Sequence, residues 1–254
     1  MADLLVIAFM VSAGLATALG WFPILVVQRL GHRTHDTLLG FAAGIMVAVA
    51  VLDILPKSAE PASGPWTGIA LGIVAGVLTI LVLVRLIRHI PLPMPFVRNS
   101  VHVNPGTAFL LFLALAIHNA PEGLATGLGY AEGLTRSGHA VAFAIALQNI
   151  PEGLLVSLAV FAETRRRGPA LGYCVMSGIV EPVAGLLALL WVSAEPTAIG
   201  IASAFAVGAM ASVVAFQMIP ESHRHGHHVP ATLALAAGFA LVPLLDALIE
   251  AATR

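Results

Sequence analysis

Long apolar runs constrain this sequence more than any other feature. Of its 254 residues, 59% are apolar and only 10% are charged, whereas a soluble domain averages about 25% charged residues. A transmembrane helix needs about 20 consecutive, mostly apolar residues. The sequence therefore predicts an all-α integral membrane protein, with residues 1–254 forming a single transmembrane domain. We expect eight transmembrane helices, at roughly 3–27, 37–56, 66–87, 106–130, 138–162, 168–192, 197–219 and 230–250.

The basic residues predict how these spans are oriented. With eight spans, alternate loops share a side of the membrane, and the loops after spans 1, 3, 5 and 7 hold most of the Arg. Because Lys and Arg are enriched in cytoplasmic loops, we expect a multi-pass protein of the plasma (inner) membrane with both termini extracytoplasmic. The predicted cytoplasmic set is Arg29, Arg33, Arg85, Arg88, Arg98, Arg165, Arg166, Arg167 and Arg224, against Lys57, Arg136 and Arg254 on the other side.

Several classes of function are excluded. The net charge is -1 and no basic tract is present, so nucleic acid is not an expected partner. No Gly-x-x-x-x-Gly-Lys-Ser/Thr loop occurs, so we expect no bound nucleotide. Cys174 is the only cysteine, which excludes an intramolecular disulfide and a cluster of several Cys ligands.

A repeated polar motif lies within the apolar background of spans 4 and 5. Residues 118–123 read His-Asn-Ala-Pro-Glu-Gly, and residues 148–153 read Gln-Asn-Ile-Pro-Glu-Gly. In each copy the first and fifth side chains are four residues apart, which places them on one helix face. Ionisable residues inside a span cost several kcal/mol and usually mark a pathway.

The residue types in these motifs are those of a divalent metal site. Glu122, Glu152 and Glu181 of span 6 would repel one another unless protonated or bridged by a cation. One imidazole, His118, among carboxylate and amide oxygens suits Zn²⁺, Fe²⁺ or Mn²⁺. A thioether from Met46 would favour the softer ions Zn²⁺ or Cd²⁺. The alternative is that these polar groups only hydrogen-bond across the helix bundle.

A second internal similarity links spans 2 and 7. Residues 41–46, Phe-Ala-Ala-Gly-Ile-Met, align without gaps on residues 205–210, Phe-Ala-Val-Gly-Ala-Met. With outside termini the two spans run in opposite senses, as in the inverted repeats of secondary transporters. Coincidental patterning of small residues is the alternative. The match continues as Val49 on Val213, Pro56 on Pro220 and Ser58 on Ser222.

The two Asn-x-Pro-Glu-Gly segments resemble the signature of the ZIP (Zrt/Irt-like) family of divalent metal transporters. Glu181-Pro182 and the segment 40–46 are similar to further motifs of that family. The resemblance implies an alternating-access carrier that moves zinc, or else iron, manganese or cadmium, into the cytoplasm. It also implies a 3+2+3 arrangement, in which spans 1–3 and 6–8 form an inverted repeat around spans 4 and 5, and assembly as a homodimer. The metal would be the transported substrate, with no catalytic cofactor, and the chain would not be an enzyme.

The resemblance further implies a binuclear metal site midway across the bilayer, bridged by two glutamates. Asn149 stands where some bacterial members have Asp, so the second position lacks one negative charge and we expect it to bind metal more weakly. The first position would use Met46, His118, Glu122, Gln148 and Glu152, and the second Asn119, Glu122, Asn149, Glu152 and Glu181.

Alternative functions are a metal-selective channel and an intramembrane metalloenzyme. A channel also needs a polar pathway, so the sequence leaves it open. A zinc protease of this kind needs His-Glu-x-x-His on one helix, and that string is absent. Outside the spans, His223, His225, His227 and His228 form either a collecting site for metal that leaves the pathway or a solvated loop.

Overall fold

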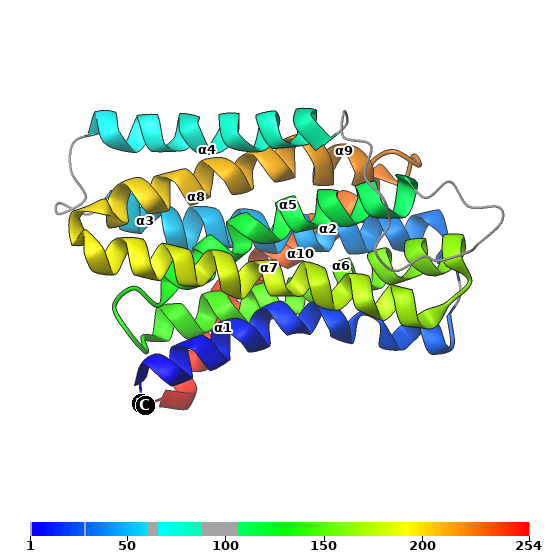
Figure 1. The fold of residues 1–254 in the computed structure, drawn as a ribbon, viewed down its shortest axis with the longest axis horizontal. Coiled ribbons are helices and arrows are strands. Elements are labelled where there is room, and N and C mark those ends of the chain that lie inside the picture. The colour runs from blue at the N-terminus through cyan, green and yellow to red at the C-terminus, as the bar shows by residue number, and fades with distance from the viewer. Residues whose placement is uncertain (1, 28, 60–65, 88–105, 254) are drawn as a thin grey trace.

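The computed structural model describes residues 2–27, 29–59, 66–87 and 106–253, and it shows a bundle of long helices (Figure 1). Arg88, Arg98 and Arg254, which contributed to the predicted orientation, lie outside these residues. The α-helices are α1 (Ala2–Leu19), α2 (His32–Ala48), α3 (Leu55–Ser58), α4 (Trp66–Ile87), α5 (Gly106–Gly129), α6 (Arg136–Thr164), α7 (Arg167–Ala194), α8 (Ile199–Val213), α9 (Ile219–Ser222) and α10 (His228–Thr253). Short 3₁₀ turns form η1 (Phe22–Leu25) and η4 (Pro196–Ala198), and π-helical turns form η2 (Val49–Ile54) and η5 (Val214–Met218).

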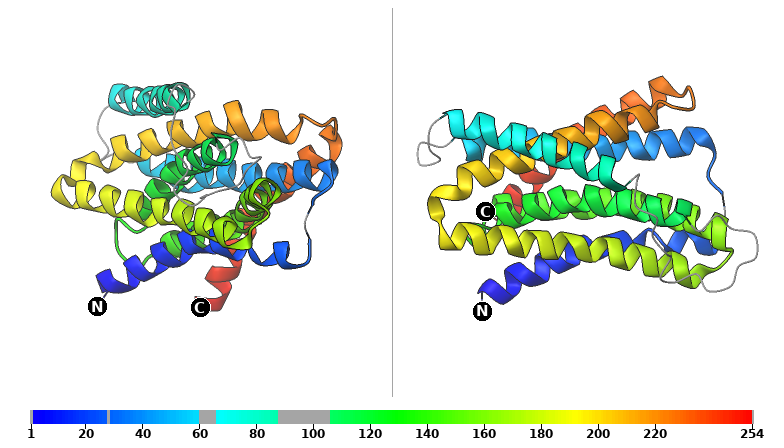
Figure 2. Two further views of the ribbon diagram at one scale, coloured as in Figure 1. Left: turned by 45° about the vertical axis from the view of Figure 1, so that its right-hand side comes forward. Right: turned by 45° about the horizontal axis from the view of Figure 1, so that its top comes forward.

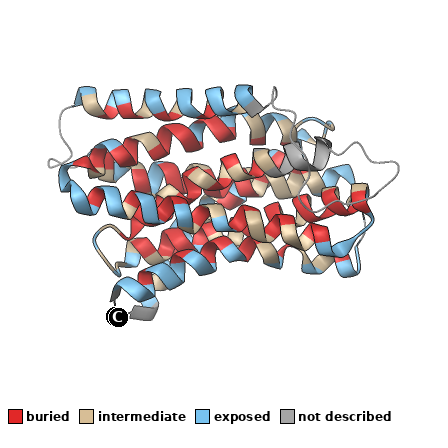
Figure 3. Ribbon diagram, in the orientation of Figure 1, coloured by how far each residue is buried: buried red, intermediate tan, exposed pale blue. Residues whose placement is uncertain are grey.

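Within the described residues, 7 helical segments are long and apolar enough to cross a membrane. They correspond to predicted spans 1–3 and 5–8. Predicted span 4 corresponds to α5, a helix of 24 residues that carries His118 and Glu122 but is not among the seven. Large apolar side chains such as Leu71, Leu187 and Leu233 are exposed on the outside of the bundle, as expected for a surface that faces lipid (Figure 3).

The first helix is shorter than predicted. We expected one helix to about residue 27, but α1 ends at Leu19 and the chain continues into the 3₁₀ turn η1. Pro23 lacks the N–H that would bond to the carbonyl of Leu19, and its ring would clash with that carbonyl in a continued α-helix. The proline therefore explains why the helix stops four residues earlier.

The helices pack through small residues, and the packing follows a repeated pattern. α2 packs on α10 where a Cβ on Gly44 would meet the carbonyl of Leu235, and α8 packs on α4 where a Cβ on Gly208 would meet the carbonyl of Ile73. Gly44 and Gly208 are equivalent in the match between spans 2 and 7. Glycine thus allows equivalent close approaches in both halves of the chain.

The local distortions of spans 2 and 7 are also in register. The π-helical turns η2 and η5 follow α2 and α8, and each is followed by a four-residue helix, α3 or α9, that contains a proline. In both short helices the serine hydroxyl donates to a backbone carbonyl three residues earlier, Ser58 to Leu55 (2.7 Å) and Ser222 to Ile219 (3.0 Å). The two spans therefore share local geometry as well as sequence.

The two ends of the bundle differ in charge. At one end Arg167 donates to the carbonyl of Leu25 (3.5 Å). Arg29 and Arg224 both line a cavity that opens at this end, and we call it the arginine-rich end. At the opposite end Arg136 forms ion pairs with Asp246 and Glu250, and α1 begins and α10 ends there (Figure 2). For these four arginines, the separation matches the partition expected from the sequence.

Candidate metal site

Helices α5, α6 and α7 bring the motif side chains into the interior of the bundle. Each motif copy lies within a continuous helix, with Pro121 inside α5 and Pro151 inside α6. Of the six carboxylate and amide side chains, none is more than 4% exposed. These six are Asn119, Glu122, Gln148, Asn149, Glu152 and Glu181.

Gln148 joins the two glutamates of the motifs. Its Nε2 donates to Oε1 of Glu122 on the neighbouring helix and to Oε1 of Glu152 one turn along its own helix (3.2 Å). One amide therefore holds two carboxylates of like charge close to each other. Two such carboxylates in a dry interior need protons or a cation to offset their repulsion.

The two asparagines hold Glu181 from both sides. Asn119 Nδ2 donates to Glu181 Oε1 (3.3 Å) and to the carbonyl of Ser177 (3.0 Å). Asn149 Nδ2 donates to the same Glu181 oxygen (2.8 Å) and to the carbonyl of Ala13 (2.9 Å). With their nitrogens used in this way, both amides leave their oxygens available.

One oxygen of each of the six side chains has no hydrogen-bond partner among the described residues. An unpaired buried oxygen costs about 1–3 kcal/mol, so six in one region is an arrangement that a bound cation would relieve. Carboxylate and amide oxygens are ligands for divalent ions. The atoms are Asn119 Oδ1, Glu122 Oε2, Gln148 Oε1, Asn149 Oδ1, Glu152 Oε2 and Glu181 Oε2.

The glycines of the motifs explain how the helices come close enough. A Cβ on Gly123 would collide with the carbonyl of Glu181 on α7, and a Cβ on Gly153 would collide with the carbonyl of Thr17 on α1. Any larger residue would push α7 or α1 away from the polar cluster. The glycine at the end of each motif therefore sets the spacing of the site.

His118 and Met46 occupy different surroundings. His118 is half-buried and lines a cavity together with Glu152. Met46 is fully buried in an apolar core that also contains Ile117 and Leu147, the residues just before His118 and Gln148. The structure thus gathers the predicted carboxylates, amides and imidazole, with Met46 in the adjoining core.

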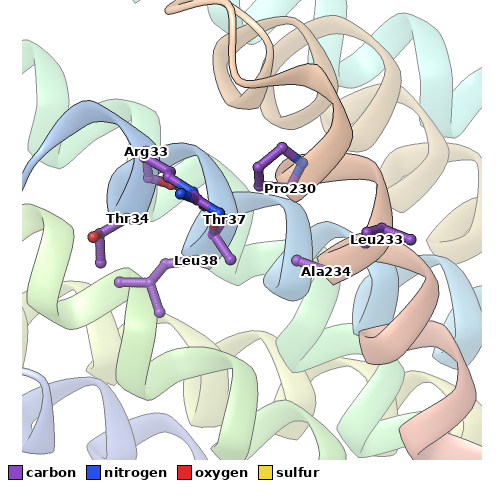
Figure 4. A pocket seen from close by; sticks show the side chains of 7 residues that line it. All are labelled: Arg33, Thr34, Thr37, Leu38, Pro230, Leu233 and Ala234. Atoms are coloured by element: carbon purple, nitrogen blue, oxygen red, sulfur yellow. Dashed lines mark hydrogen bonds between the residues drawn. The ribbon is translucent and has the colours of Figure 1, made fainter.

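The cavity has a volume of about 910 Å³ and runs from His118 and Glu152 to the arginine-rich end. Glu221 and Gln217 also line it, which places both on a route from the site to solution. A separate hollow of about 520 Å³ lies between the start of α2 and α10 (Figure 4). The seven residues that line this second hollow include no His, Asp or Glu, so it offers no such ligand.

The histidines after α9 divide into two pairs. His223 and His228 stack on each other, with ring centroids 5.5 Å apart. His225 and His227 instead turn toward Asp36 at the start of α2. No role was expected for Asp36 or for its neighbour His35, because 189 residues separate Asp36 from His225 and no spacing rule connects them.

A family model described as "ZIP Zinc transporter" matches residues 95–246, more than half of the chain. The chain belongs to the ZIP zinc transporter family. The resemblance to this family, first indicated by the paired motif, is thereby confirmed. Members of this family are transporters rather than enzymes, so the chain is a membrane transporter whose substrate is a metal, and zinc is the metal that the family's name gives.

Three relatives in this family cover most of the chain. The zinc transporter ZIPB of Bordetella bronchiseptica is 37% identical over 91% of this chain and 77% of its own length. The zinc transporter GufA of Myxococcus xanthus is 35% identical over 92% of this chain and 94% of its own. The zinc transporter ZupT of Corynebacterium efficiens is 33% identical over 91% of each. The similarity thus extends well beyond residues 95–246.

Proposed function

We propose that this protein carries Zn²⁺ across the plasma membrane into the cytoplasm by alternating access, with Fe²⁺, Mn²⁺ and Cd²⁺ as further substrates. The observation that carries the proposal is the set of six unpaired, buried oxygens beside His118. A ZIP zinc transporter needs a place inside the bilayer where the ion exchanges water for protein ligands. These oxygens and the imidazole supply such ligands.

In this proposal the ion occupies two neighbouring positions bridged by Glu122 and Glu152. The first position is the stronger, because it includes the nitrogen of His118. The second is weaker, because Asn119 and Asn149 contribute neutral oxygens and Glu181 is the only additional carboxylate. The first position comprises Met46, His118, Glu122, Gln148 and Glu152, and the second Asn119, Glu122, Asn149, Glu152 and Glu181.

The shape of the cavity supports a carrier rather than a channel. The cavity joins the site to the arginine-rich end, which we propose faces the cytoplasm because basic residues are enriched on that side of a membrane. On the opposite side of the site, Leu128 and Tyr130 are almost fully buried. Access from one side at a time is the property that distinguishes alternating access from an open pore.

The matched packing supports the 3+2+3 arrangement with an inverted repeat. Exchanging span 1 with 6, 2 with 7, 3 with 8 and 4 with 5 converts the contact of α2 with α10 into that of α8 with α4. The same exchange converts the contact of α5 with α7 into that of α6 with α1. We propose that the two halves move relative to spans 4 and 5 during transport, and that the protein assembles as a homodimer.

Zinc flux into proteoliposomes tests the proposal. Purified protein is reconstituted in vesicles that contain a zinc-sensitive dye, and the initial rate is measured against external Zn²⁺. We expect saturable uptake that Cd²⁺, Fe²⁺ or Mn²⁺ inhibits by competition. Glu152→Gln should abolish uptake, whereas Glu195→Gln, the same change at an exposed position, should leave the rate unchanged.

Each alternative gives a different result. A rate that rises linearly with Zn²⁺ and does not saturate would show a channel. Absence of flux in the unmodified protein would contradict transport altogether. Normal uptake by Glu152→Gln would show that the ion takes another route.

A further inference from the structure

A second group of metal-ligating side chains lies on the wall of the same cavity, at its arginine-rich end. His35 and Asp36 belong to the first turn and a half of α2, and His225 and His227 follow α9. We call these four residues the Asp36 cluster. His35 and His225 line the cavity that reaches His118 and Glu152.

The distances within the cluster are close to those between the ligands of one metal ion. Nδ1 of His225 lies 2.8 Å and Nδ1 of His35 lies 3.3 Å from Oδ1 of Asp36, and the three ligand atoms lie within 4.8 Å of one another. Zinc bonds to nitrogen and oxygen are about 2.0–2.2 Å long, so two ligands of a tetrahedral ion are about 3.3–3.6 Å apart. Small side-chain rotations would therefore place an ion between the three atoms.

His227 completes the cluster by orienting the carboxylate. Its Nδ1 lies 3.0 Å from the other oxygen of Asp36, Oδ2, so the carboxylate is held on both sides. Gly226, between the two histidines, has a φ of 86°, a left-handed conformation that glycine adopts without strain. This turn lets His225 and His227 face the same acid, and a hydrogen bond of this kind fixes a metal ligand in place.

The burial of Asp36 points to a cation as its partner. The side chain is fully buried, and its ion-pair contacts among the described residues are with His35, His225 and His227 only, without Lys or Arg. While these imidazoles are neutral, the charge of the buried carboxylate is uncompensated, which is costly. The surrounding imidazoles are good ligands for the divalent ions that this family transports.

We propose that His35, Asp36 and His225 form a divalent-metal site separate from the central one, with a fourth coordination position open to the cavity. Three protein ligands and one open position suit an ion that binds and leaves, whereas structural zinc sites are closed by four. The ion would occupy this site between the central site and solution at the arginine-rich end. This role as an intermediate binding site on the transport path rests on the proposed transport function, but the binding itself does not.

Binding is tested with Co²⁺, whose visible absorption is strong in tetrahedral sites and weak in octahedral ones. The background is purified full-length protein with His118→Ala, Glu122→Ala and Glu152→Ala, which removes the imidazole and both bridging carboxylates of the central site. We expect one Co²⁺ per chain with tetrahedral absorption, displaced by Zn²⁺. Adding His225→Gln, at a partly exposed side chain, should weaken Co²⁺ binding at least about tenfold, and so should Asp36→Asn.

The matched control is His228→Gln, a change of the same kind three residues along the chain at the start of α10, at a ring that stacks on His223. It should leave Co²⁺ binding unchanged. If the background binds no Co²⁺, or if His225→Gln binds it as tightly as the background, the proposed site is wrong. Both results are independent of whether the unmodified protein transports zinc.

The role as an intermediate binding site is tested by measuring zinc transport in single variants of the otherwise unmodified protein. His225→Gln should lower the maximal rate of zinc uptake about tenfold, while His228→Gln keeps the full rate. A full rate of zinc uptake in His225→Gln would overturn the role as an intermediate binding site. Zinc flux in the unmodified protein tests the transport proposal separately.

Discussion

The two sides of the central site share a scaffold but differ in chemistry. Asn119 donates to the carbonyl of Ser177 on α7, and Asn149 donates to the carbonyl of Ala13 on α1. Gly123 approaches Glu181, and Gly153 approaches Thr17. Ala13 and Thr17 precede Ser177 and Glu181 by 164 residues, the same spacing that relates Phe41 to Phe205.

The equivalent positions nevertheless carry different functional groups. Glu181 supplies a carboxylate where Thr17 supplies a hydroxyl that donates to its own helix, at the carbonyl of Gly14 (2.8 Å). His118 supplies an imidazole where Gln148 supplies an amide. The duplicated backbone thus provides two equivalent sets of helix contacts. Glu122 and Glu152 are matched across them, whereas the imidazole of His118 and the carboxylate of Glu181 occur on α5 and α7 alone. We infer that close packing requires symmetry and that metal binding does not.

Making α5 resemble α6 should have the largest effect. His118→Gln replaces the imidazole by the amide found at Gln148 and should weaken zinc binding roughly 100-fold, because a nitrogen ligand is lost. Isothermal titration calorimetry of the purified protein with Zn²⁺ measures this change in affinity. An unchanged affinity would show that the imidazole is not a ligand.

Breaking the shared scaffold should have similar effects on both sides. Gly123→Ala and Gly153→Ala each place a Cβ against a backbone carbonyl and should lower the free energy of unfolding by about 1–3 kcal/mol. Gly168→Ala, where a Cβ would meet nothing within 4 Å, is the matched control. Thermal unfolding in detergent measures the three, and a large difference between the first two would contradict the symmetry of the packing.

Making α7 resemble α1 should weaken only the second metal position. Glu181→Thr introduces the residue found at Thr17 and should reduce zinc uptake roughly tenfold, while the high-affinity zinc at the first position remains. Uptake and zinc stoichiometry are measured on the same preparation. Loss of all bound zinc would mean that the two positions are not separable.

Making α6 resemble α5 should have the smallest effect. Gln148→His adds an imidazole and should tighten zinc binding by less than about tenfold, because the same change alters the hydrogen bonds that Gln148 donates to Glu122 and Glu152. Competition with a zinc chelator resolves such a gain. Weaker binding would show that holding the two carboxylates together matters more than an additional nitrogen.

The sequence predicted the helices and the chemistry of the site better than it predicted contacts between distant segments. Apolar length located seven candidate spans among the described residues, and α5 occupies the place of the predicted fourth. The spacing of His118 and Glu122 placed them on one face. The early end of α1 at Leu19 was missed, because apolar composition continues past the interruption at Pro23. The Asp36 cluster was missed because the start of α2 and the turn after α9 meet only in the folded bundle.

The zinc positions in crystals provide the most direct test of the central claim. Anomalous scattering at the zinc edge, from protein crystallised with Zn²⁺, locates the ion independently of any assumed ligand. We expect a peak about 2.0–2.2 Å from a ring nitrogen of His118 and from carboxylate oxygens of Glu122 and Glu152. A protein that transports zinc but shows no anomalous peak between these three residues would contradict it.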